Sequence, residues 1–491
     1  MNLNPITLID GYKLSHREQY PSGTTKVYSN WTPRGSRIPE QKHVVFFGLQ
    51  YFLQEYLMNQ FHRDFFERSW ESVENRYANR IRGYLGTKDP AVEHIKDLHK
   101  LGSMPLEFAA LPEGTLCPLR VPMFSIVNTS DERFFWLPNY IETILSCSIW
   151  GSCTSATSAY RFRQMLNVAA QNTGGDPSFV GWQGHDFSFR GMFGLEAAVM
   201  SGAGHLLSFT GTDTIPALDF IDEYYGGDNG FVGGSVPASE HSVASAHWAN
   251  SNIQVYDESA YIEHMLDLYP TGIFSMVSDT FNLWKVLELC GTKYKDRILA
   301  RDGKVVFRPD SGDPIKIVCG DPDAPEGSPE RKGVIRLLDE YFGHTVTSTG
   351  HKLVNGNVGC IYGDAITYDR GQAICRGLAA NGYASTNMVF GVGSFTYTFV
   401  TRDTYGFAMK ATWAKVNGEG RDLFKKPITD TGEKFSATGR LAVVRNNGVL
   451  TVIERATPEQ EAVSLLEPVW KNGKFLRTQS FADVRRMLWL S

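Results

Sequence analysis

Long apolar runs are missing from the sequence, and so is an excess of charge of either sign. No stretch reaches the ~18 consecutive apolar residues of a membrane-spanning helix. The first residues, MNLNPITLIDGYK, carry neither a basic start nor a continuous apolar segment, so we expect no secretion signal. With 48 Lys and Arg against 53 Asp and Glu, the net charge is −5, which gives no overall basic field. We therefore expect a cytoplasmic protein that binds neither nucleic acid nor membranes.

Cysteine is scarce, and its distribution argues against two kinds of stabilising site. The chain has seven cysteines, an odd number, and they are scattered without a C-x-x-C pair. A disulfide framework or a zinc site is therefore not expected, and buried reduced thiols fit better. The remaining composition is ordinary for a globular protein. With 42% hydrophobic and 21% charged residues over 491 positions, the chain can form a large core and two domains.

From about residue 180, short apolar runs recur and each ends in a polar or glycine-containing cluster. Helix-compatible segments lie between them, for example at 259–269 and 333–343. This alternation predicts a parallel α/β sheet or an irregular (β/α) barrel, in which chemistry is found at the carboxyl ends of the strands. The runs are HLLSFTGTDT (205–214), FVGGSVPASEHS (231–242), GIFSMVSDTF (272–281), KVVFRPDSGDP (304–314), VGCIYGDAIT (358–367) and NMVFGVGS (387–394).

The two ends of the chain have a different character. The pattern predicts a strand at 26–31, an apolar run passing into a helix at 44–57, a helix at 69–85 and strand pieces at 118–129. After about residue 395, TYTFVTRD, YGFAMKATWAKV and LAVVRNNGVLTVIE read as antiparallel strands, the last with an Asn-Asn-Gly turn. We expect a barrel-like catalytic domain at 181–394. Segments 1–180 and 395–491 would together form a second, mixed α+β domain that is largely antiparallel.

Two of the polar clusters combine carboxylates with turn-forming residues. In RPDSGDP (308–314), Arg308 could hold a phosphate and Asp310 a sugar hydroxyl, or the segment could be an ordinary turn with a loop ion pair. In GCIYGDAIT (359–367), Asp364 follows Gly363 and could bind vicinal ribose hydroxyls, or it could cap the next helix. Both interpretations remain open for each cluster.

Three further clusters suit a flat, phosphorylated ligand. FGVGSF (390–395), which contains Gly393 and Ser394, could present backbone N–H groups to a phosphate or form only a tight turn. If HDFSFRG (185–191) is extended, Phe187 could stack a heteroaromatic ring and Arg190 hold a phosphate, or the phenylalanines could belong to the core. In GTDT (211–214), Asp213 could accept a hydrogen bond from a substrate amide or cap a helix.

The stretch SVPASEHS (235–242) places His241 among small and polar residues. A structural hydrogen bond or a reactive imidazole would both fit this context. Zinc fits poorly, because there is no H-E-x-x-H motif and His247 lies six residues on, off the spacing of two ligands on one helix face. Taken together, the clusters favour an enzyme that binds an anionic, sugar-containing ligand at the strand ends.

Seven clusters in this order resemble those of the nicotinamide phosphoribosyltransferases, type II enzymes of the nicotinate and nicotinamide phosphoribosyltransferase family. They are IDGYKLSHREQYP (9–21), HDFSFRG, GTDT, SVPASEHS, VSDTF (277–281), RPDSGDP and YGDAIT (362–367), and the similarity runs from residue 4 to about 485. The resemblance implies a pentosyltransferase that joins nicotinamide to 5-phosphoribosyl 1-pyrophosphate, releasing nicotinamide mononucleotide and pyrophosphate in NAD salvage. It also implies Mg²⁺, ATP as a co-substrate and a homodimer with shared active sites.

The resemblance also implies a role for each matched residue. His241 would be the phosphorylated histidine, and Asp279 would hydrogen-bond its ring and fix the tautomer. Asp310 and Glu240 would complete the catalytic group, while no metal ligand is assigned. The residues implied for substrate binding are Tyr12 (from the partner subunit), Phe187, Arg190, Asp213, Ser235, Val236, Ser275, Arg308, Gly363, Asp364, Gly393 and Ser394. Those implied for polyphosphate binding from the partner subunit are Arg34, Arg402, Lys410 and Lys434.

One position departs from the family pattern, and two alternative functions are open. Ser394 stands where the family usually has a further glycine, so a side chain enters the phosphate loop. The near alternative is a nicotinate phosphoribosyltransferase, which Asp213 disfavours because its carboxylate would repel that of nicotinate. The distant alternative is a non-catalytic binding protein on the same scaffold.

Overall fold

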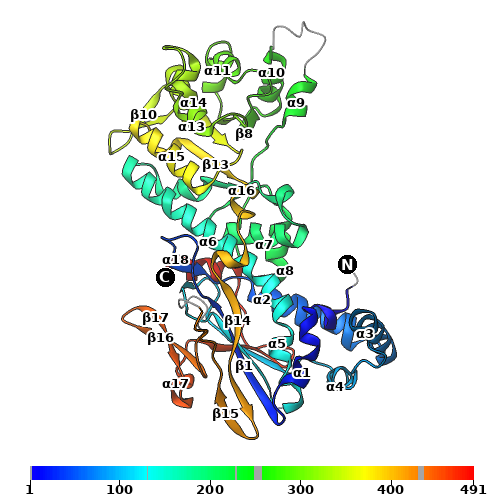
Figure 1. Cartoon of the computed structure of the whole chain (residues 1–491). Helices are drawn as coiled ribbons and strands as arrows, with labels where there is room; N and C mark the ends of the chain where they lie inside the picture. The colour runs from blue at the N-terminus through cyan, green and yellow to red at the C-terminus, as the bar shows by residue number, and fades with distance from the viewer. Residues whose placement is uncertain (1–2, 130, 227–228, 248–256, 430–435, 491) are drawn as a thin grey trace. The chain divides into compact units, whose positions relative to one another are not determined.

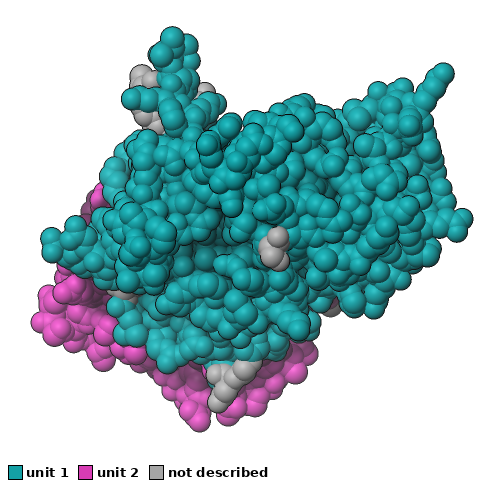
Figure 2. Space-filling view, turned by 90° about the horizontal axis from the view of Figure 1, so that it is seen from below, with its two compact units in different colours: residues 1–157, 219–230, 400–491 teal, residues 158–218, 231–399 magenta. Residues whose placement is uncertain are grey.

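A computed structural model of the chain describes residues 3–129, 131–226, 229–247, 257–429 and 436–490 (Figure 1). The chain divides into two compact units, which Figure 2 colours separately. Unit 2 comprises residues 158–218 and 231–399, and unit 1 comprises residues 1–157, 219–230 and 400–491. All seven cysteines are free thiols. No helix in the described part of the chain is both long enough and apolar enough to cross a membrane.

Unit 2 is built on a six-stranded sheet in which every neighbouring pair is parallel. Its strands bury Val305, Phe307, Cys360 and Phe390 in one hydrophobic core. Such near-continuous apolar strands are typical of parallel sheets covered by helices. In spatial order the strands are β7 (Gly211–Thr212), β6 (Gly184–Asp186), β13 (Met388–Val392), β12 (Val358–Tyr362), β9 (Gly303–Arg308) and β8 (Gly272–Val277).

The segment from 231 to 239 connects the two edges of this sheet. Gly234 pairs with Gly211 beside β7, and Ala238 pairs with Ser275 in β8, both in parallel bridges. Backbone bonds reinforce the two bridges, from Thr212 N to Gly234 O at 3.0 Å and from Ser275 N to Pro237 O at 2.8 Å. The sheet is therefore curled and its edges share one connecting segment, which confirms the predicted irregular barrel-like architecture.

The helices of unit 2 begin at recognisable capping residues. Asp313 accepts a hydrogen bond from Ile315 N at 2.9 Å and precedes Pro314 at the start of α13, while Ser328 and Thr367 cap α14 and α15. The helices are α7 (Leu195–Leu206), α9 (His241–Ala246), α10 (Ser259–Leu268), α11 (Leu283–Gly291), α12 (Lys295–Leu299), α13 (Pro314–Cys319), α14 (Pro329–Phe342), α15 (Tyr368–Ala380) and α16 (Ser394–Tyr397). A hairpin joins β10 (His344–Val346) and β11 (Lys352–Val354). The long helix α6 (Glu142–Thr173) supplies residues to both units.

Unit 1 contains a seven-stranded antiparallel sheet with strands from both ends of the sequence, as predicted. In spatial order the strands are β15 (Glu419–Asp422), β14 (Phe407–Val416), β1 (Thr24–Pro33), β5 (Phe124–Asn128), β3 (Leu106–Ala110), β18 (Glu467–Lys471) and β19 (Lys474–Phe475). The longest pairing joins β1 to β14, so segments almost 400 positions apart lie side by side. This arrangement brings the N-terminal and C-terminal segments into one sheet.

Smaller elements complete unit 1. The predicted Asn-Asn-Gly hairpin is present, with Asn447 and Gly448 at φ 48° and 83°, the left-handed conformation that such turns require. The remaining strands are β2 (His43–Val45), β4 (Leu116–Pro118), β16 (Leu441–Asn446) and β17 (Val449–Glu454). The helices are α1 (His16–Gln19), α2 (Leu49–Phe52), α3 (Trp70–Leu85), α4 (Glu93–Leu101), α5 (Leu137–Tyr140), α8 (Pro216–Tyr224), α17 (Pro458–Ala462) and α18 (Phe481–Leu490).

Three predicted strands are wrong in whole or in part. The run at 205–214 is helical up to Leu206 and extended only over Gly211–Thr212, because a buried apolar run suits a helix as well as a strand. The segment at 396–403 forms helical turns, since Thr396 N and Thr398 N bond the local carbonyls of Gly393 and Ser394. In HDFSFRG the strand stops at Asp186 and a 3-10 turn follows at Phe189–Gly191.

Candidate active site

The carboxyl ends of the six parallel strands place most of the predicted site residues along one edge of the sheet. Five of the strands are followed within one or two positions by a predicted site residue, and the sixth, β9, has such a residue as its last position. The pairs are β6 with Phe187, β7 with Asp213, β8 with Asp279, β9 with Arg308, β12 with Gly363 and β13 with Gly393. Because parallel strands all point the same way, clusters that are distant in sequence meet here.

Phe187 lies against the backbone of two neighbouring strands. Its N–H donates to Val392 O at 3.0 Å, which continues the pairing of β6 with β13. A Cβ atom added at Gly363 would lie 2.8 Å from the Phe187 ring, and one at Gly391 would lie closer still. Glycine at these positions therefore makes room for the ring. The side chain is only half-buried, so part of it is accessible to a flat ligand.

Asp213 is held by two residues from other loops. Its Oδ1 accepts hydrogen bonds from His185 Nε2 at 2.8 Å and from Ser235 Oγ at 2.7 Å. Among the described residues no hydrogen bond reaches Oδ2, and the side chain is 46% exposed. Burial would raise the pKa of Asp213, but His185, Ser235 and Arg308 outweigh it and hold the pKa below its ordinary value. Asp213 is thus an ionised acceptor with one oxygen available, and it does not cap a helix.

His185, which the sequence analysis did not select, lies beside Phe187 in the structure. Its ring centroid lies 5.0 Å from that of Phe187, and its Nε2 faces Asp213. In the sequence His185 is the first residue of the HDFSFRG stretch, next to Asp186. Its partner 28 positions away could not be read from the sequence. His185 is therefore an additional member of the site.

His241 is exposed and is the first residue of α9, which follows the segment that connects the sheet edges. Its Nδ1 lies 3.0 Å from Thr280 Oγ1, and its Nε2 lies 3.9 Å from Asp279 Oδ1. The second distance is longer than a hydrogen bond, so the carboxylate faces the ring without being bonded to it. The hydroxyl of Thr280, which the sequence did not indicate, is the closer partner of the ring.

Asp279 connects His241 to the RPDSGDP turn. Its Oδ2 accepts from Asp310 N at 2.9 Å and from Ser311 Oγ at 2.6 Å. Its Oδ1 is buried and has no hydrogen-bond partner in the described part of the chain, so the atom that faces the imidazole of His241 is unsatisfied. An unsatisfied buried carboxylate oxygen at this place suits a proton donor or a cation brought by a ligand.

Arg308 and Asp310 form the ion pair that the turn interpretation predicted, with 3.2 Å between Nε and Oδ2. Burial raises the pKa of Asp310, and the neighbouring carboxylates Asp279 and Asp364 raise it further against the lowering effect of Arg308 and His241. The RPDSGDP segment is therefore a turn with a loop ion pair, and the same turn carries candidate site residues. Asp364 is exposed. It does not cap α15, because Thr367 does so.

A further carboxylate, Glu258, is buried near Asp279 and was not predicted. Its Oε2 accepts from Asn282 N at 3.4 Å, while its Oε1 has no partner among the described residues. Burial, with a contribution from Asp279, raises the pKa of Glu258 to about 7. Glu258 therefore keeps its proton to a higher pH than an ordinary glutamate does.

The remaining predicted residues of unit 2 lie on the same loops. Glu240 accepts a hydrogen bond from Ser242, Val236 is 36% exposed, and Arg190 is exposed on its 3-10 turn. Ser275 is 5% exposed, and its hydroxyl has no partner in the described residues. These positions lie on the same strands and connecting segments as the residues described above.

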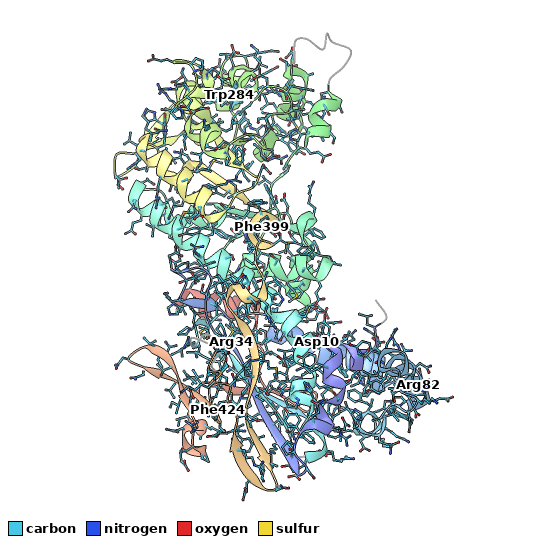
Figure 3. The ribbon with its side chains drawn as sticks, in the orientation of Figure 1. Asp10, Arg34, Arg82, Trp284, Phe399 and Phe424 are labelled. Carbon is cyan, nitrogen blue, oxygen red and sulfur yellow. The ribbon has the colours of Figure 1, made fainter. Side chains whose placement is uncertain are left out.

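The predicted residues of unit 1 include an exposed aromatic ring and a group of cations. Tyr12 is 59% exposed, and Arg34, labelled in Figure 3, donates through Nε to Gly406 O at 3.0 Å. Burial lowers the pKa of Lys410, and the charges of Arg34, Lys425 and Lys13 lower it further, opposed by Glu142. Arg402 is exposed and pairs with the adjacent Asp403. Lys434 lies outside the described residues.

Two family models and several known proteins match the chain. Residues 182–474 match the nicotinate phosphoribosyltransferase (NAPRTase) family, and residues 4–88 match the N-terminal domain of nicotinamide phosphoribosyltransferase. The chain is 46% identical to a nicotinamide phosphoribosyltransferase of Acinetobacter baylyi, over 99% of this chain and 97% of the relative. It is 32% identical to one of Xanthomonas campestris pv. campestris, over 98% and 97% of the two chains.

The chain belongs to the nicotinate and nicotinamide phosphoribosyltransferase family. Two solved structures support the fold assignment at low sequence identity. A human nicotinic acid phosphoribosyltransferase superposes with a TM-score of 0.55 at 16% identity, over 98% of this chain and 93% of that one. A nicotinate-nucleotide pyrophosphorylase of Pyrococcus furiosus gives 0.57 at 16% identity, over 99% and 95%. At this level of identity the two structures carry information on the fold alone.

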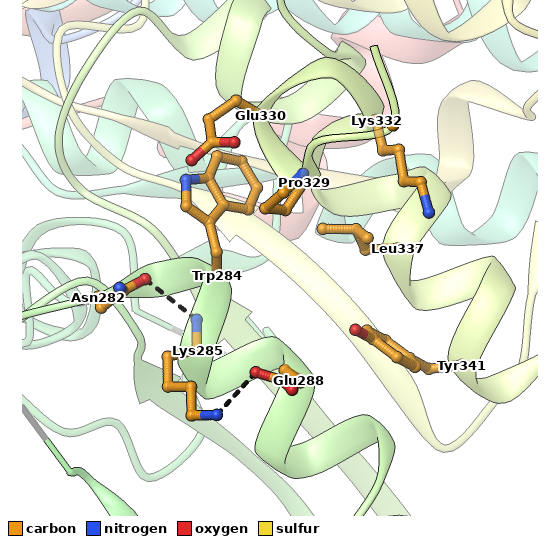
Figure 4. Close-up of a pocket in the computed structure, with 10 residues that line it drawn as sticks. Asn282, Trp284, Lys285, Glu288, Pro329, Glu330, Lys332, Leu337 and Tyr341 are labelled. Atoms are coloured by element: carbon orange, nitrogen blue, oxygen red, sulfur yellow. Dashed lines mark hydrogen bonds and ion pairs between the residues drawn. The ribbon is translucent and has the colours of Figure 1, made fainter. Parts of the chain in front are cut away.

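The structure also contains a pocket on unit 2 that is lined by none of the predicted site residues (Figure 4). It has a volume of about 410 Å³ and lies between α11 and α14. Its walls include the rings of Trp284 and Tyr341, and its lysines are already paired with carboxylates, Lys285 with Glu288 among them at 2.8 Å. The charges of this pocket are therefore compensated internally.

Proposed function

We propose that the chain transfers the 5-phosphoribosyl group from 5-phosphoribosyl 1-pyrophosphate to nicotinamide, giving nicotinamide mononucleotide and pyrophosphate in NAD salvage. One observation carries the proposal: an accessible aromatic ring, an ionised amide acceptor and a group of carboxylates follow neighbouring strands at one sheet edge. They are Phe187, Asp213 and the group Asp279, Asp310 and Asp364. A flat carboxamide-bearing ring and a ribose need these groups together.

In the proposed reaction the ring nitrogen of nicotinamide attacks C1 of the ribose while the bond from C1 to the pyrophosphate oxygen breaks. Phe187 stacks on the base and Asp213 Oδ2 accepts its amide N–H, which orients the nitrogen toward the sugar. Positive charge develops on the ribose as the pyrophosphate leaves, and nearby carboxylates stabilise it electrostatically. Asp310, with Asp279 and Asp364 close enough to affect its pKa, is placed to do so.

Mg²⁺ is expected with the pyrophosphate group, and the donors of the site fit that role. Magnesium in such sites usually takes one or two carboxylates together with substrate phosphates and water. The described residues contain no group of three or more metal-binding side chains. The carboxylate of Asp310 would therefore be the protein's share of the ligands, because Oδ1 of Asp279 faces the imidazole of His241. When bound, Mg²⁺ neutralises charge on the leaving pyrophosphate.

We also propose that ATP phosphorylates His241 and that this drives synthesis. The imidazole is exposed, so a phosphoryl group can reach it, and Thr280 and Asp279 lie at its two nitrogens. A neutral ring attacks through one nitrogen, and a hydrogen bond to the other fixes the tautomer. Glu240 and Ser275 lie beside the same segment. Cleavage of the γ-phosphate bond of ATP would leave ADP and phosphohistidine.

A second copy of the chain would complete the site. Under this proposal Tyr12 of the other subunit covers the second face of the base, and Arg34, Arg402, Lys410 and Lys434 bind the polyphosphate. The exposure of Tyr12 and the group of cations around Lys410 support this role. A two-fold homodimer would form two equivalent sites of this kind.

The related nicotinate reaction and a non-catalytic role are the alternatives. Nicotinate would place its carboxylate against ionised Asp213, whereas nicotinamide would donate an N–H to it. The deciding assay supplies purified protein with nicotinamide or nicotinate, 5-phosphoribosyl 1-pyrophosphate and Mg²⁺, with and without ATP, and detects the mononucleotide. Product from nicotinamide only is expected. Product from nicotinate alone, or no product at all, would reject the proposal.

The phosphohistidine step has its own test. The His241→Ala variant should keep some basal synthesis but lose ATP hydrolysis and the stimulation of turnover by ATP. Incubation with γ-labelled ATP should give an acid-labile label in the wild type. The label should be missing from the variant, and undiminished labelling there would contradict the assignment to His241.

A further inference from the structure

The residues after β12 form a loop, 363–367, whose backbone is anchored by two side chains that the reaction itself does not use. Ala365 has φ 49°, in the left-handed region that a residue with a Cβ seldom adopts. Its carbonyl accepts a hydrogen bond from Arg370 Nη1 at 2.6 Å. The next carbonyl, that of Ile366, accepts from Thr396 Oγ1 at 2.7 Å. Two successive peptide units are thus fixed next to Asp364.

These two anchors come from different places. Arg370 lies in the first turn of α15, which the same loop caps through Thr367. Thr396 lies in the turn at 393–396, where its N–H donates to Gly393 O at 3.1 Å. The guanidinium of Arg370 also lies 5.7 Å from the ring of Phe395 in that turn. The 363–367 loop, the 393–396 turn and α15 are therefore joined directly.

We propose that Thr396 and Arg370 are positioning residues that set the spacing between the ribose and 5′-phosphate subsites. The inference rests on the proposed function, in which Asp364 binds ribose hydroxyls and the backbone at Gly393 and Ser394 binds the phosphate. A hydroxyl from the phosphate turn that bonds the ribose loop ties the two subsites into one unit. Ala365, with its strained φ, needs these two anchoring hydrogen bonds, because a strained residue keeps its conformation only when its neighbours hold it.

The consequence is selective. Loosening the link should weaken binding of the phosphoribosyl donor, which must contact both subsites at once. Under the proposed function nicotinamide contacts Phe187 and Asp213, which follow β6 and β7. The ring of Phe187 packs against Gly363 at the start of the loop, whereas the two anchors bond the carbonyls of Ala365 and Ile366 further along, so nicotinamide binding should change less than binding of the donor. Replacing a residue with only a general structural role would instead raise the KM values of both substrates together, or lower the melting temperature without a selective change in either KM.

The test compares KM values and kcat for Thr396→Val, which keeps the shape of the side chain but loses its hydroxyl. We expect KM for 5-phosphoribosyl 1-pyrophosphate to rise about three- to tenfold, the effect of one neutral hydrogen bond. KM for nicotinamide and kcat should stay within twofold, and Thr396→Ser should restore the wild-type value. Arg370→Gln should give the same pattern, and the double variant should show less than the sum of the two effects.

A matched control is Thr292→Val at the end of α11, since the Thr292 hydroxyl also donates to a carbonyl, Glu288 O, at 2.7 Å. This variant should leave both KM values unchanged. An unchanged donor KM in Thr396→Val, or equal rises for both substrates, would overturn the inference. Wild-type protein without any turnover of these substrates would instead reject the proposed function, so the two failures are distinguishable.

Discussion

Replacing Asp213 with asparagine tests how the protein distinguishes an amide from a carboxylate. Asp213 is ionised, its Oδ1 is occupied by His185 and Ser235, and its Oδ2 is available to a ligand. The asparagine side chain has nearly the same size, and its oxygen can still accept an N–H from nicotinamide. Its charge is gone, however, and its NH₂ group can donate to the carboxylate of nicotinate. The variant should therefore gain activity on nicotinate.

The size of the effect follows from Coulomb's law. Two unit charges about 4 Å apart repel by about 4 kcal/mol at an effective dielectric of 20, and by about 1 kcal/mol in bulk water. The Asp213 side chain is 46% exposed without ligand, and a bound base would cover part of it, so the true value lies between these limits. Since about 1.4 kcal/mol corresponds to tenfold in rate, these limits predict that the amide-to-acid ratio of kcat/KM falls by at least about fivefold and at most several hundredfold.

The assay measures kcat/KM for nicotinamide and nicotinate in parallel, at a pH where the wild-type carboxyl is ionised. Ser235→Ala is the matched control, because it removes one hydrogen bond from Asp213 and leaves the charge in place. It should affect both substrates similarly. If Asp213→Asn left the ratio within about twofold of the wild-type value, the electrostatic account of specificity would be refuted.

Three further outcomes are expected. Phe187→Ala should raise KM for nicotinamide, because a stacking partner worth about 0.5–1.5 kcal/mol beyond its buried area is lost; an unchanged KM would contradict stacking. Asp279→Ala should reduce the γ-phosphate labelling of His241 with little change in nicotinamide binding, as measured by calorimetry. Glu258 keeps its proton up to about pH 7 in the folded state but loses it near pH 4.5 in the unfolded chain. The free energy of unfolding should therefore decrease as the pH rises from about 4.5 to about 7. Thermal unfolding of Glu258→Gln should lack that fall.

The strand ends were predictable because two regularities of sequence coincide there. Apolar runs of strand length are visible in GIFSMV, KVVFR and VGCIY, and each is followed at once by turn-forming and charged residues. Parallel strands then bring those residues to one edge without any further information. The same logic failed at 205–214, where the apolar residues of α7 continue almost into β7 and no local signal separates helix from strand.

Contacts between loops were not predictable. Thr280 as the nearest partner of His241, and His185 as a partner of Asp213, depend on how loops 39 and 28 positions apart in sequence meet in space. The segment at 231–239 was read as another strand of the series, yet it bonds to both edges of the sheet. These features arise from the closure of the sheet, and a pattern of residue types carries no information on closure.

The backbone at Gly393 and Ser394 shows whether this turn needs the further glycine that the family resemblance led us to expect at position 394. Gly393 has φ −96°, and Ser394 starts a helical turn with ordinary negative φ, so neither position requires glycine for its conformation. The Ser394 side chain instead takes up space beside Gly191, where an added Cβ would collide with it. Serine at 394 therefore depends on glycine at 191. Because phosphate binding here would use backbone N–H groups, a side chain directed toward Gly191 leaves those donors unobstructed.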